Sequence, residues 1–213
     1  MRLFDLLPLL TLFGNSLAFP TGVSSSIESR QLGLGGSTRN DLNGGKCGKV
    51  VIIFARGTTE PGNVGAVAGP PFFDALTKKV PDLVVQGVDY AADVGGIIEL
   101  GDKEGTAKMA ELVKKAVSQC PDAAIVMSGY SQGAMLVHNA ATQLGDVTSK
   151  VTATVTFGDP FQTQKIPGVQ NQKVFCAAGD GVCSGTFIIT PAHLTYGSNA
   201  NAAADFVVQA VGL

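Results

Sequence analysis

The 213-residue sequence contains no tryptophan, only two histidines and few charged residues, which make up 15% of the chain. Its formal net charge of −2 provides no basic surface for binding nucleic acid or anionic membranes. No apolar run is long enough to span a bilayer. Hydrophobic residues make up 45% of the chain, which excludes disorder. We therefore expect a compact monomer with no nucleic-acid partner and no integral membrane association.

The N-terminal 30 residues have the pattern of export and processing segments. Arg2 precedes an apolar run at 3–13, and small residues at Ser16 and Ala18 suit signal-peptide cleavage after Ala18. Residues 19–30 are polar and serine-rich, as in a pro-segment or flexible leader. We expect a secreted protein with a signal peptide at 1–18, a leader at 19–30 and a single folded domain at 31–213. Mature N-termini after Ala18 and after Arg30 both remain open.

Cysteine is scarce but even in number, at positions 47, 120, 176 and 183. In an exported chain four cysteines predict two disulfides, for which three pairings exist. Cys176 and Cys183 are close enough to close a short loop, which favours that pair together with Cys47–Cys120. No histidine lies at ligand spacing from them, so we expect no metal site.

Short apolar runs alternate with helix-length amphipathic segments from residue 49 onward. The runs that predict strands are 50–54, 83–88, 124–127, 151–157 and 173–177. The segments that predict helices are 106–118, 132–144 and 201–211. This alternation predicts an α/β fold of three layers, with a central parallel five-stranded sheet flanked by helices. Ligands bind such sheets at the carboxyl edge of the strands.

The pentapeptide Gly129-Tyr130-Ser131-Gln132-Gly133 matches the Gly-x-Ser-x-Gly pattern. In a chain with 27 glycines, chance produces such a match about one time in five, so its surroundings must decide. An apolar run at 124–127 leads into it and a helical pattern follows directly. That strand–turn–helix context is typical of a nucleophile elbow, whereas a plain glycine turn is the alternative. Ser131 is the candidate nucleophile.

A serine nucleophile needs a general base, and the chain offers two histidines. His138 follows Ser131 by seven residues on the same predicted helix, which separates them by about 10 Å. That distance is too long for proton transfer, so His138 is expected to be a structural or surface residue. His193, in a loop-like stretch after the last predicted strand, is the candidate base.

In the chain order of α/β hydrolases, the acid that orients the base comes after the serine and before the histidine. Asp146, Asp159 and Asp180 lie in that interval. Asp180 falls inside the favoured Cys176–Cys183 loop, which would hold its carboxylate rigidly. Asp159 suits a turn cap but remains the rival.

Stabilising the oxyanion requires two donors. The backbone N–H of Gln132, the residue after the nucleophile, is one candidate. The other is the loop that follows the first strand, where the Thr58 hydroxyl can supplement its N–H. A polar turn with Arg56 and Glu60 paired is compatible with this role.

Together these motifs resemble the fungal cutinases and their relatives, from about residue 31 to the C-terminus. Residues 121–133 fit the family's nucleophile pattern, residues 55–60 resemble its oxyanion loop, and residues 176–193 fit its acid–base pattern. The resemblance implies a single catalytic α/β-hydrolase domain without a full lid. It implies a triad of Ser131, Asp180 and His193, with Thr58 and Gln132 as oxyanion donors. It also implies the two disulfides favoured above.

The resemblance further implies a secreted serine esterase that hydrolyses cutin, the plant cuticle polyester, and short-chain soluble esters without a cofactor. Apolar residues that would bind the acyl chain are Val94, Phe187, Ile189 and Leu194. An acetylxylan esterase of the same family is the alternative, although Phe187 and Ile189 favour a longer acyl chain. A non-catalytic secreted effector that retains the fold is a third hypothesis.

Overall fold

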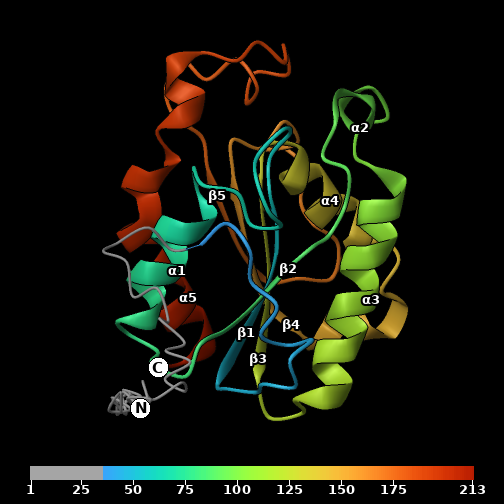
Figure 1. Ribbon diagram of the computed structural model, residues 1–213, viewed down its shortest axis with the longest axis vertical. Helices are drawn as coiled ribbons and strands as arrows, with labels where there is room; N and C mark the ends of the chain where they lie inside the picture. Colours follow the sequence, from blue (N-terminus) through green and yellow to red (C-terminus); the bar gives the residue numbers. More distant parts are fainter. Residues whose placement is uncertain (1–35) are drawn as a thin grey trace, which may run out of the picture. The chain divides into compact units, whose positions relative to one another are not determined.

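The computed structural model describes residues 36–213, so the expected signal peptide, the leader and the first residues of the expected domain lie outside the described residues. Residues 36–213 form three layers, with a parallel five-stranded sheet between two layers of helices (Figure 1). The strand order is β2-β1-β3-β4-β5, and each neighbouring pair is parallel. The predicted fold class is therefore confirmed.

The strands are β1 (Val50–Ala55), β2 (Val84–Gly87), β3 (Ala124–Tyr130), β4 (Val151–Phe157) and β5 (Asn171–Phe175). All five were expected. β4 has the predicted limits, those of β1 and β2 differ by one residue at one or both ends, and those of β3 and β5 differ by two or more. β3 runs three residues further because Ser128 is accommodated in the sheet, where its hydroxyl donates to the Val155 carbonyl at 2.7 Å. β5 starts two residues earlier than its apolar run, because an edge strand can expose polar residues such as Asn171 to solvent.

The helices are α1 (Gly69–Thr77), α2 (Val94–Ile98), α3 (Lys103–Gln119), α4 (Gln132–Ala141) and α5 (Ala200–Val211). α1 and α2 were not predicted from the sequence. α1 begins with Gly69, Pro70 and Pro71, and prolines are compatible with the first turn of a helix because its N–H groups lack intrahelical partners. α4 ends three residues earlier than expected, and a 3₁₀ helix at Gly145–Lys150 follows it.

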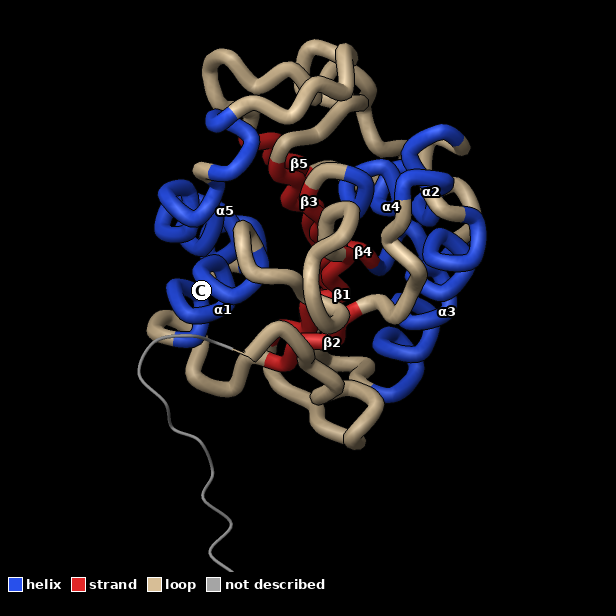
Figure 2. Tube along the Cα trace, turned by 45° about the horizontal axis from the view of Figure 1, so that its top comes forward, coloured by secondary structure: helices blue, strands red, loops and turns tan. Residues whose placement is uncertain are grey.

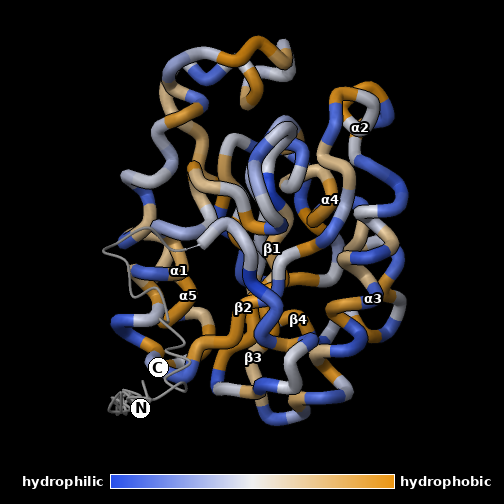
Figure 3. The backbone as a smooth tube through the Cα atoms, viewed as in Figure 1, coloured by the Kyte–Doolittle hydropathy of each residue, from blue (hydrophilic) through white to orange (hydrophobic). Residues whose placement is uncertain are grey.

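Two hydrophobic cores lie on opposite faces of the sheet. α1 and α5 cover one face, and α3 and α4 cover the other (Figure 2). Along β1, Ile52 and Phe54 enter the first core, whereas Ile53 enters the second. Because both faces are covered, β1 and the first four residues of β3 are continuous apolar runs and not alternating ones, and Figure 3 shows hydrophobic segments at the centre of the sheet. β4 instead alternates apolar residues with threonines, of which Thr154 and Thr156 are buried.

Two disulfides anchor the loops around this framework, and both join the pairs that the sequence favoured. Cys47–Cys120 connects the segment before β1 to the end of α3. Cys176–Cys183 closes a loop directly after β5. No helix within residues 36–213 has the length and apolarity needed to cross a bilayer. In this range no three His, Cys, Asp or Glu side chains cluster as a metal site would require.

Candidate active site

Ser131 occupies the sharp turn between β3 and α4. Its backbone has φ 57° and ψ −120°, a strained conformation for a residue with a Cβ. Its N–H donates to the Phe157 carbonyl at 2.9 Å, which ties the turn to β4. A Cβ at Gly133 would lie 2.0 Å from the Ala55 carbonyl oxygen, so only glycine allows this close approach of α4 to β1. The backbone thus presents Ser131 at the carboxyl edge of the sheet.

A continuous hydrogen-bond chain joins Ser131, His193 and Asp180. His193 Nε2 lies 3.0 Å from Ser131 Oγ, and His193 Nδ1 lies 2.8 Å from Asp180 Oδ2. The histidine is held in a 3₁₀ helix (Pro191–Leu194), and both His193 and Asp180 are buried. With Nδ1 protonated and bound to the carboxylate, Nε2 is available to accept the serine proton.

The carboxylate of Asp180 is stabilised as an anion in spite of its burial. Burial alone would raise the pKa of Asp180, but hydrogen bonds from His193, from Tyr196 and from the Val182 N–H bring that pKa below its ordinary value. Asp180 therefore remains charged at neutral pH and can stabilise a protonated His193.

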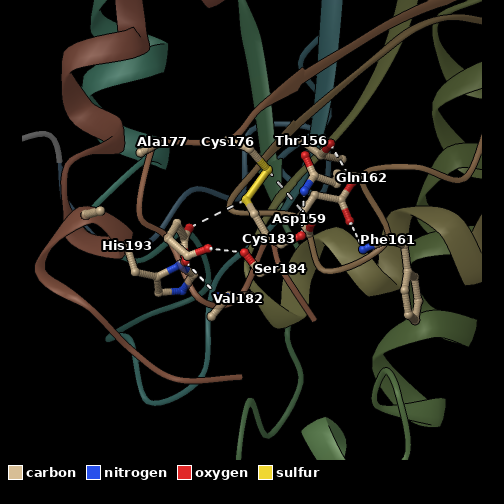
Figure 4. The surroundings of a disulfide bond; sticks show 12 residues. Thr156, Asp159, Phe161, Gln162, Cys176, Ala177, Val182, Cys183, Ser184 and His193 are labelled. Atoms are coloured by element: carbon tan, nitrogen blue, oxygen red, sulfur yellow. Dashed lines mark hydrogen bonds and ion pairs between the residues drawn. A yellow bond between two sulfur atoms is a disulfide. The ribbon is translucent and has the colours of Figure 1, made fainter. Parts of the chain in front are cut away.

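The rival acid, Asp159, belongs to a different cluster. Its carboxylate binds His138 at 2.9 Å and accepts hydrogen bonds from the Thr156 hydroxyl and the Phe161 N–H. Figure 4 shows Asp159 on one side of the Cys176–Cys183 disulfide and His193 on the other. Asp159 thus caps the turn after β4, and His138 is a buried structural partner.

Thr58 and Gln132 lie side by side because β1 and β3 are neighbours in the sheet. The Gln132 amide nitrogen donates to Thr58 Oγ1 at 2.9 Å and to the Asp93 carbonyl at 2.7 Å. Because Thr58 Oγ1 accepts this bond, its own proton remains free for another acceptor. The sequence analysis used only the backbone N–H of Gln132, since nothing local indicates where its side chain points.

The loop that carries Thr58 is held by Glu60. The Glu60 carboxylate accepts hydrogen bonds from the N–H groups of Gly57 at 2.8 Å, and of Ala66 and Val67 at 2.9 Å each. Arg56 donates to the main-chain carbonyl of Glu60 at 2.8 Å, so the expected Arg56–Glu60 pair forms through the backbone and not through the carboxylate.

A cavity of about 480 Å³ opens beside Ser131 and His193. Of the four apolar residues expected to bind an acyl chain, Val94, Ile189 and Leu194 line this cavity. Phe187 is not among the lining residues, and the backbone of its loop turns there with φ 56°. Further lining residues are Thr58, Thr59, Glu60, Pro61, Ala66, Val67, Ile97 and Tyr130. Ile97 was missed because it reaches the cavity only through the short helix α2, where it lies one turn after Val94.

The chain is similar to known proteins across most of its length. A sequence profile of the family described as Cutinase matches residues 46–211. Cutinase 4 of Emericella nidulans is 50% identical over 183 residues, which is 84% of this chain and 79% of the relative. The structure of Trichoderma reesei cutinase in complex with a phosphonate inhibitor aligns with a TM-score of 0.77 at 41% identity, over 83% of this chain and 80% of that chain.

The catalytic core domain of acetyl xylan esterase from Trichoderma reesei has the same fold. It aligns with a TM-score of 0.62 at 21% identity, over 77% of this chain and 99% of that chain. The matched profile covers more than half of the chain, and the high identity to Cutinase 4 extends over most of both proteins. The chain therefore belongs to the cutinase family and is a carboxylic ester hydrolase.

Proposed function

We propose that the protein hydrolyses the ester bonds of cutin and of short-chain soluble esters through an acyl-enzyme on Ser131. The observation that carries this proposal is the chain Ser131–His193–Asp180, which ends at a solvent-accessible cavity with apolar walls. Acetylxylan esterase activity of the same site is the alternative.

The reaction proceeds in two halves. Ser131 Oγ attacks the ester carbonyl carbon while His193 Nε2 takes its proton, and the charge of Asp180 stabilises the imidazolium. The Gln132 N–H and the Thr58 hydroxyl donate to the oxyanion. The alcohol leaves with the proton from His193. Water, deprotonated by His193, then attacks the acyl-enzyme and releases the acid.

The surroundings of the cavity support a water-insoluble substrate. Val94, Ile189 and Leu194 line the cavity and expose 61%, 58% and 59% of their surfaces, and their neighbours Ile98 and Ile188 are also exposed. Figure 3 shows hydrophobic segments at α2 and in the loop between β5 and α5. Contiguous apolar surface of this kind marks an interaction site, and it fits a polyester or lipid-like chain.

The nucleophile is tested by Ser131→Ala, which is expected to reduce p-nitrophenyl butyrate hydrolysis by at least about 10³-fold. Ser128→Ala is the matched control, because Ser128 lies three residues earlier on β3 and its hydroxyl bonds to the Val155 carbonyl. This control is expected to retain activity. Substantial turnover by folded Ser131→Ala would refute the proposal, as would the absence of an organophosphate adduct on Ser131 in the wild type.

The substrate class is tested by a series of p-nitrophenyl esters from acetate to longer acyl chains. The apolar cavity walls predict that kcat/KM rises beyond acetate. A strict preference for acetate, together with release of acetate from acetylated xylan, would favour the alternative function.

We also propose that the protein is a secreted monomer whose catalytic domain spans 31–213, after a signal peptide at 1–18 and a leader at 19–30. The two disulfides fit an oxidising compartment. Mass spectrometry of protein from the medium is expected to give a mature N-terminus after Ala18 or Arg30. Full-length protein retained in the cell would contradict this.

A further inference from the structure

A third group binds the carboxylate oxygen that His193 uses. Tyr196, three residues after His193, is 1% exposed, and its hydroxyl donates to Asp180 Oδ2 at 2.5 Å. The same oxygen accepts the bond from His193 Nδ1 at 2.8 Å. The sequence analysis did not single out Tyr196, and the reaction described above does not use it.

We propose that Tyr196 is a positioning residue of the hydrolytic site, which orients the Asp180 carboxylate and moderates its attraction for the protonated form of His193. This inference rests on the proposed function, because it concerns how the Ser131–His193–Asp180 chain is adjusted.

The direction of the Tyr196 hydroxyl proton is determined by its neighbours. The Ala177 N–H donates to Tyr196 Oη at 3.0 Å, so the phenol oxygen acts as acceptor there and its single proton is directed to Asp180. Burial and the hydrogen bond to Asp180 raise the pKa of Tyr196. The phenol therefore stays protonated wherever the enzyme works, and it is a permanent donor.

The tyrosine ring is packed in place independently of its hydroxyl. It lies perpendicular to the His193 ring, with centroids 6.1 Å apart, and its centroid is 5.8 Å from that of the Tyr130 ring. The Tyr130 hydroxyl in turn donates to the His193 carbonyl at 2.8 Å. Replacing Tyr196 by phenylalanine keeps this ring packing, so the substitution isolates the hydroxyl.

Sharing Oδ2 between two donors has a predictable effect on catalysis. Each donor stabilises the carboxylate and spreads its charge, so less of that charge is available to His193. Without the phenol proton, Asp180 would stabilise the imidazolium form of His193 more strongly. Since hydrolysis requires neutral His193, the acid limb of the kcat/KM profile would move to higher pH.

The test compares pH profiles of Tyr196→Phe and wild type on p-nitrophenyl butyrate. We expect the acid limb to move up by about half a unit to one unit, and kcat at the plateau to fall by roughly 3- to 10-fold. KM is expected to stay within about 2-fold, because Tyr196 is not among the cavity-lining residues. The downfield Nδ1 proton of His193 in NMR spectra is expected to shift as well.

Tyr90→Phe is the matched control, because the Tyr90 hydroxyl donates to the Arg56 carbonyl at 2.6 Å, away from Asp180. Its acid limb is expected to coincide with that of wild type. A Tyr196→Phe enzyme that loses thermal stability but keeps the wild-type acid limb and Nδ1 resonance would overturn the inference, because Tyr196 would then be only structural.

A second variant covers the case in which Tyr196→Phe does not fold. Site-specific 3-fluorotyrosine at position 196 keeps the ring and is a stronger donor, so it is expected to move the acid limb in the opposite direction, to lower pH. If the acid limb of the kcat/KM profile did not move in this variant, the inference would be overturned. Turnover by Ser131→Ala would instead refute the proposed function, so the two failures are distinguishable.

Discussion

The side-chain amide of Gln132 donates a hydrogen bond to the hydroxyl oxygen of Thr58 over 2.9 Å. This contact joins the first residue of α4 to the loop after β1, across 74 positions of sequence. Because the amide occupies one lone pair of Thr58 Oγ1, the hydroxyl proton is left to point at a developing oxyanion. In the proposed mechanism Gln132 would contribute in two ways, through its backbone N–H and through the orientation of Thr58.

A double-mutant cycle tests this relationship. Thr58→Val removes the hydroxyl but keeps the β-branched shape, and it is expected to lower kcat/KM by about 10²-fold, as for other oxyanion donors. Gln132→Met keeps the backbone N–H and is expected to cost less, about 10-fold. If the amide acts through Thr58, the double variant resembles Thr58→Val alone. Fully multiplicative effects on kcat/KM would show that the two side chains act independently. Thr58→Ser, which keeps the hydroxyl, is the conservative control.

The two disulfides are expected to separate stability from activity. A chain-entropy estimate assigns about 4.5 kcal/mol to Cys47–Cys120 and about 2.5 kcal/mol to the shorter Cys176–Cys183 loop. Removing the first pair by alanine substitution is expected to lower Tm more and leave kcat near the wild-type value. Removing the second is expected to cost less stability but to lower kcat, because Asp180 lies within that loop. Equal effects on kcat would contradict the expected role of the short loop.

Gly158 is expected to be essential for the position of His193. Its φ is 55°, and an added Cβ would lie 2.8 Å from His193 Cε1. Gly158→Ala is expected to lower kcat by at least about 10-fold and to lose about 1 kcal/mol or more of stability. Gly145→Ala is the matched control, because Gly145 has φ 58° with no neighbour within 4 Å of the added Cβ. Gly145→Ala introduces the same positive-φ backbone strain without the contact to His193. If both variants lost kcat equally, the prediction would be contradicted.

Asp41 is expected to make stability depend on acid pH. Burial raises its pKa, but the hydrogen bonds from Arg39 and the Val85 N–H outweigh this, and the net pKa lies below the ordinary value of 3.8. A carboxyl group whose pKa is lower in the folded state stabilises the protein fully at pH values above its unfolded-state pKa. That stabilisation is lost as the pH falls through the folded-state pKa. Asp41→Asn is expected to destabilise by on the order of 1 kcal/mol at pH 7. In urea unfolding, the difference in the free energy of unfolding between wild type and Asp41→Asn should shrink below about pH 4. A difference that is constant with pH would contradict this.

Most of the fold could be predicted because its signals are local. β1 and the start of β3 are continuous apolar runs, and such runs indicate burial on both faces without knowledge of the neighbours. α1 was not predicted because its start at Gly69-Pro70-Pro71 is typical of a loop. Its two phenylalanines find their partners only in the folded protein, where Phe73 packs against Phe54 of β1 and Phe72 against Phe157 of β4. α2 is five residues long, too short for a periodic pattern.

Three features of the site could be predicted from the residues alone: the strand, turn and helix around Ser131, the exclusion of His138 by helical geometry, and the short loop that contains Asp180. These features depend on residues close together in the chain. The choice between Asp159 and Asp180 depends on the folded protein, because both residues follow neighbouring parallel strands and loop packing turns only Asp180 toward His193. The bonds from Gln132 to Thr58 and from Tyr196 to Asp180 were likewise invisible in the sequence. A side-chain hydrogen bond between distant residues depends on strand order and rotamer, and neither leaves a periodic or spacing signal.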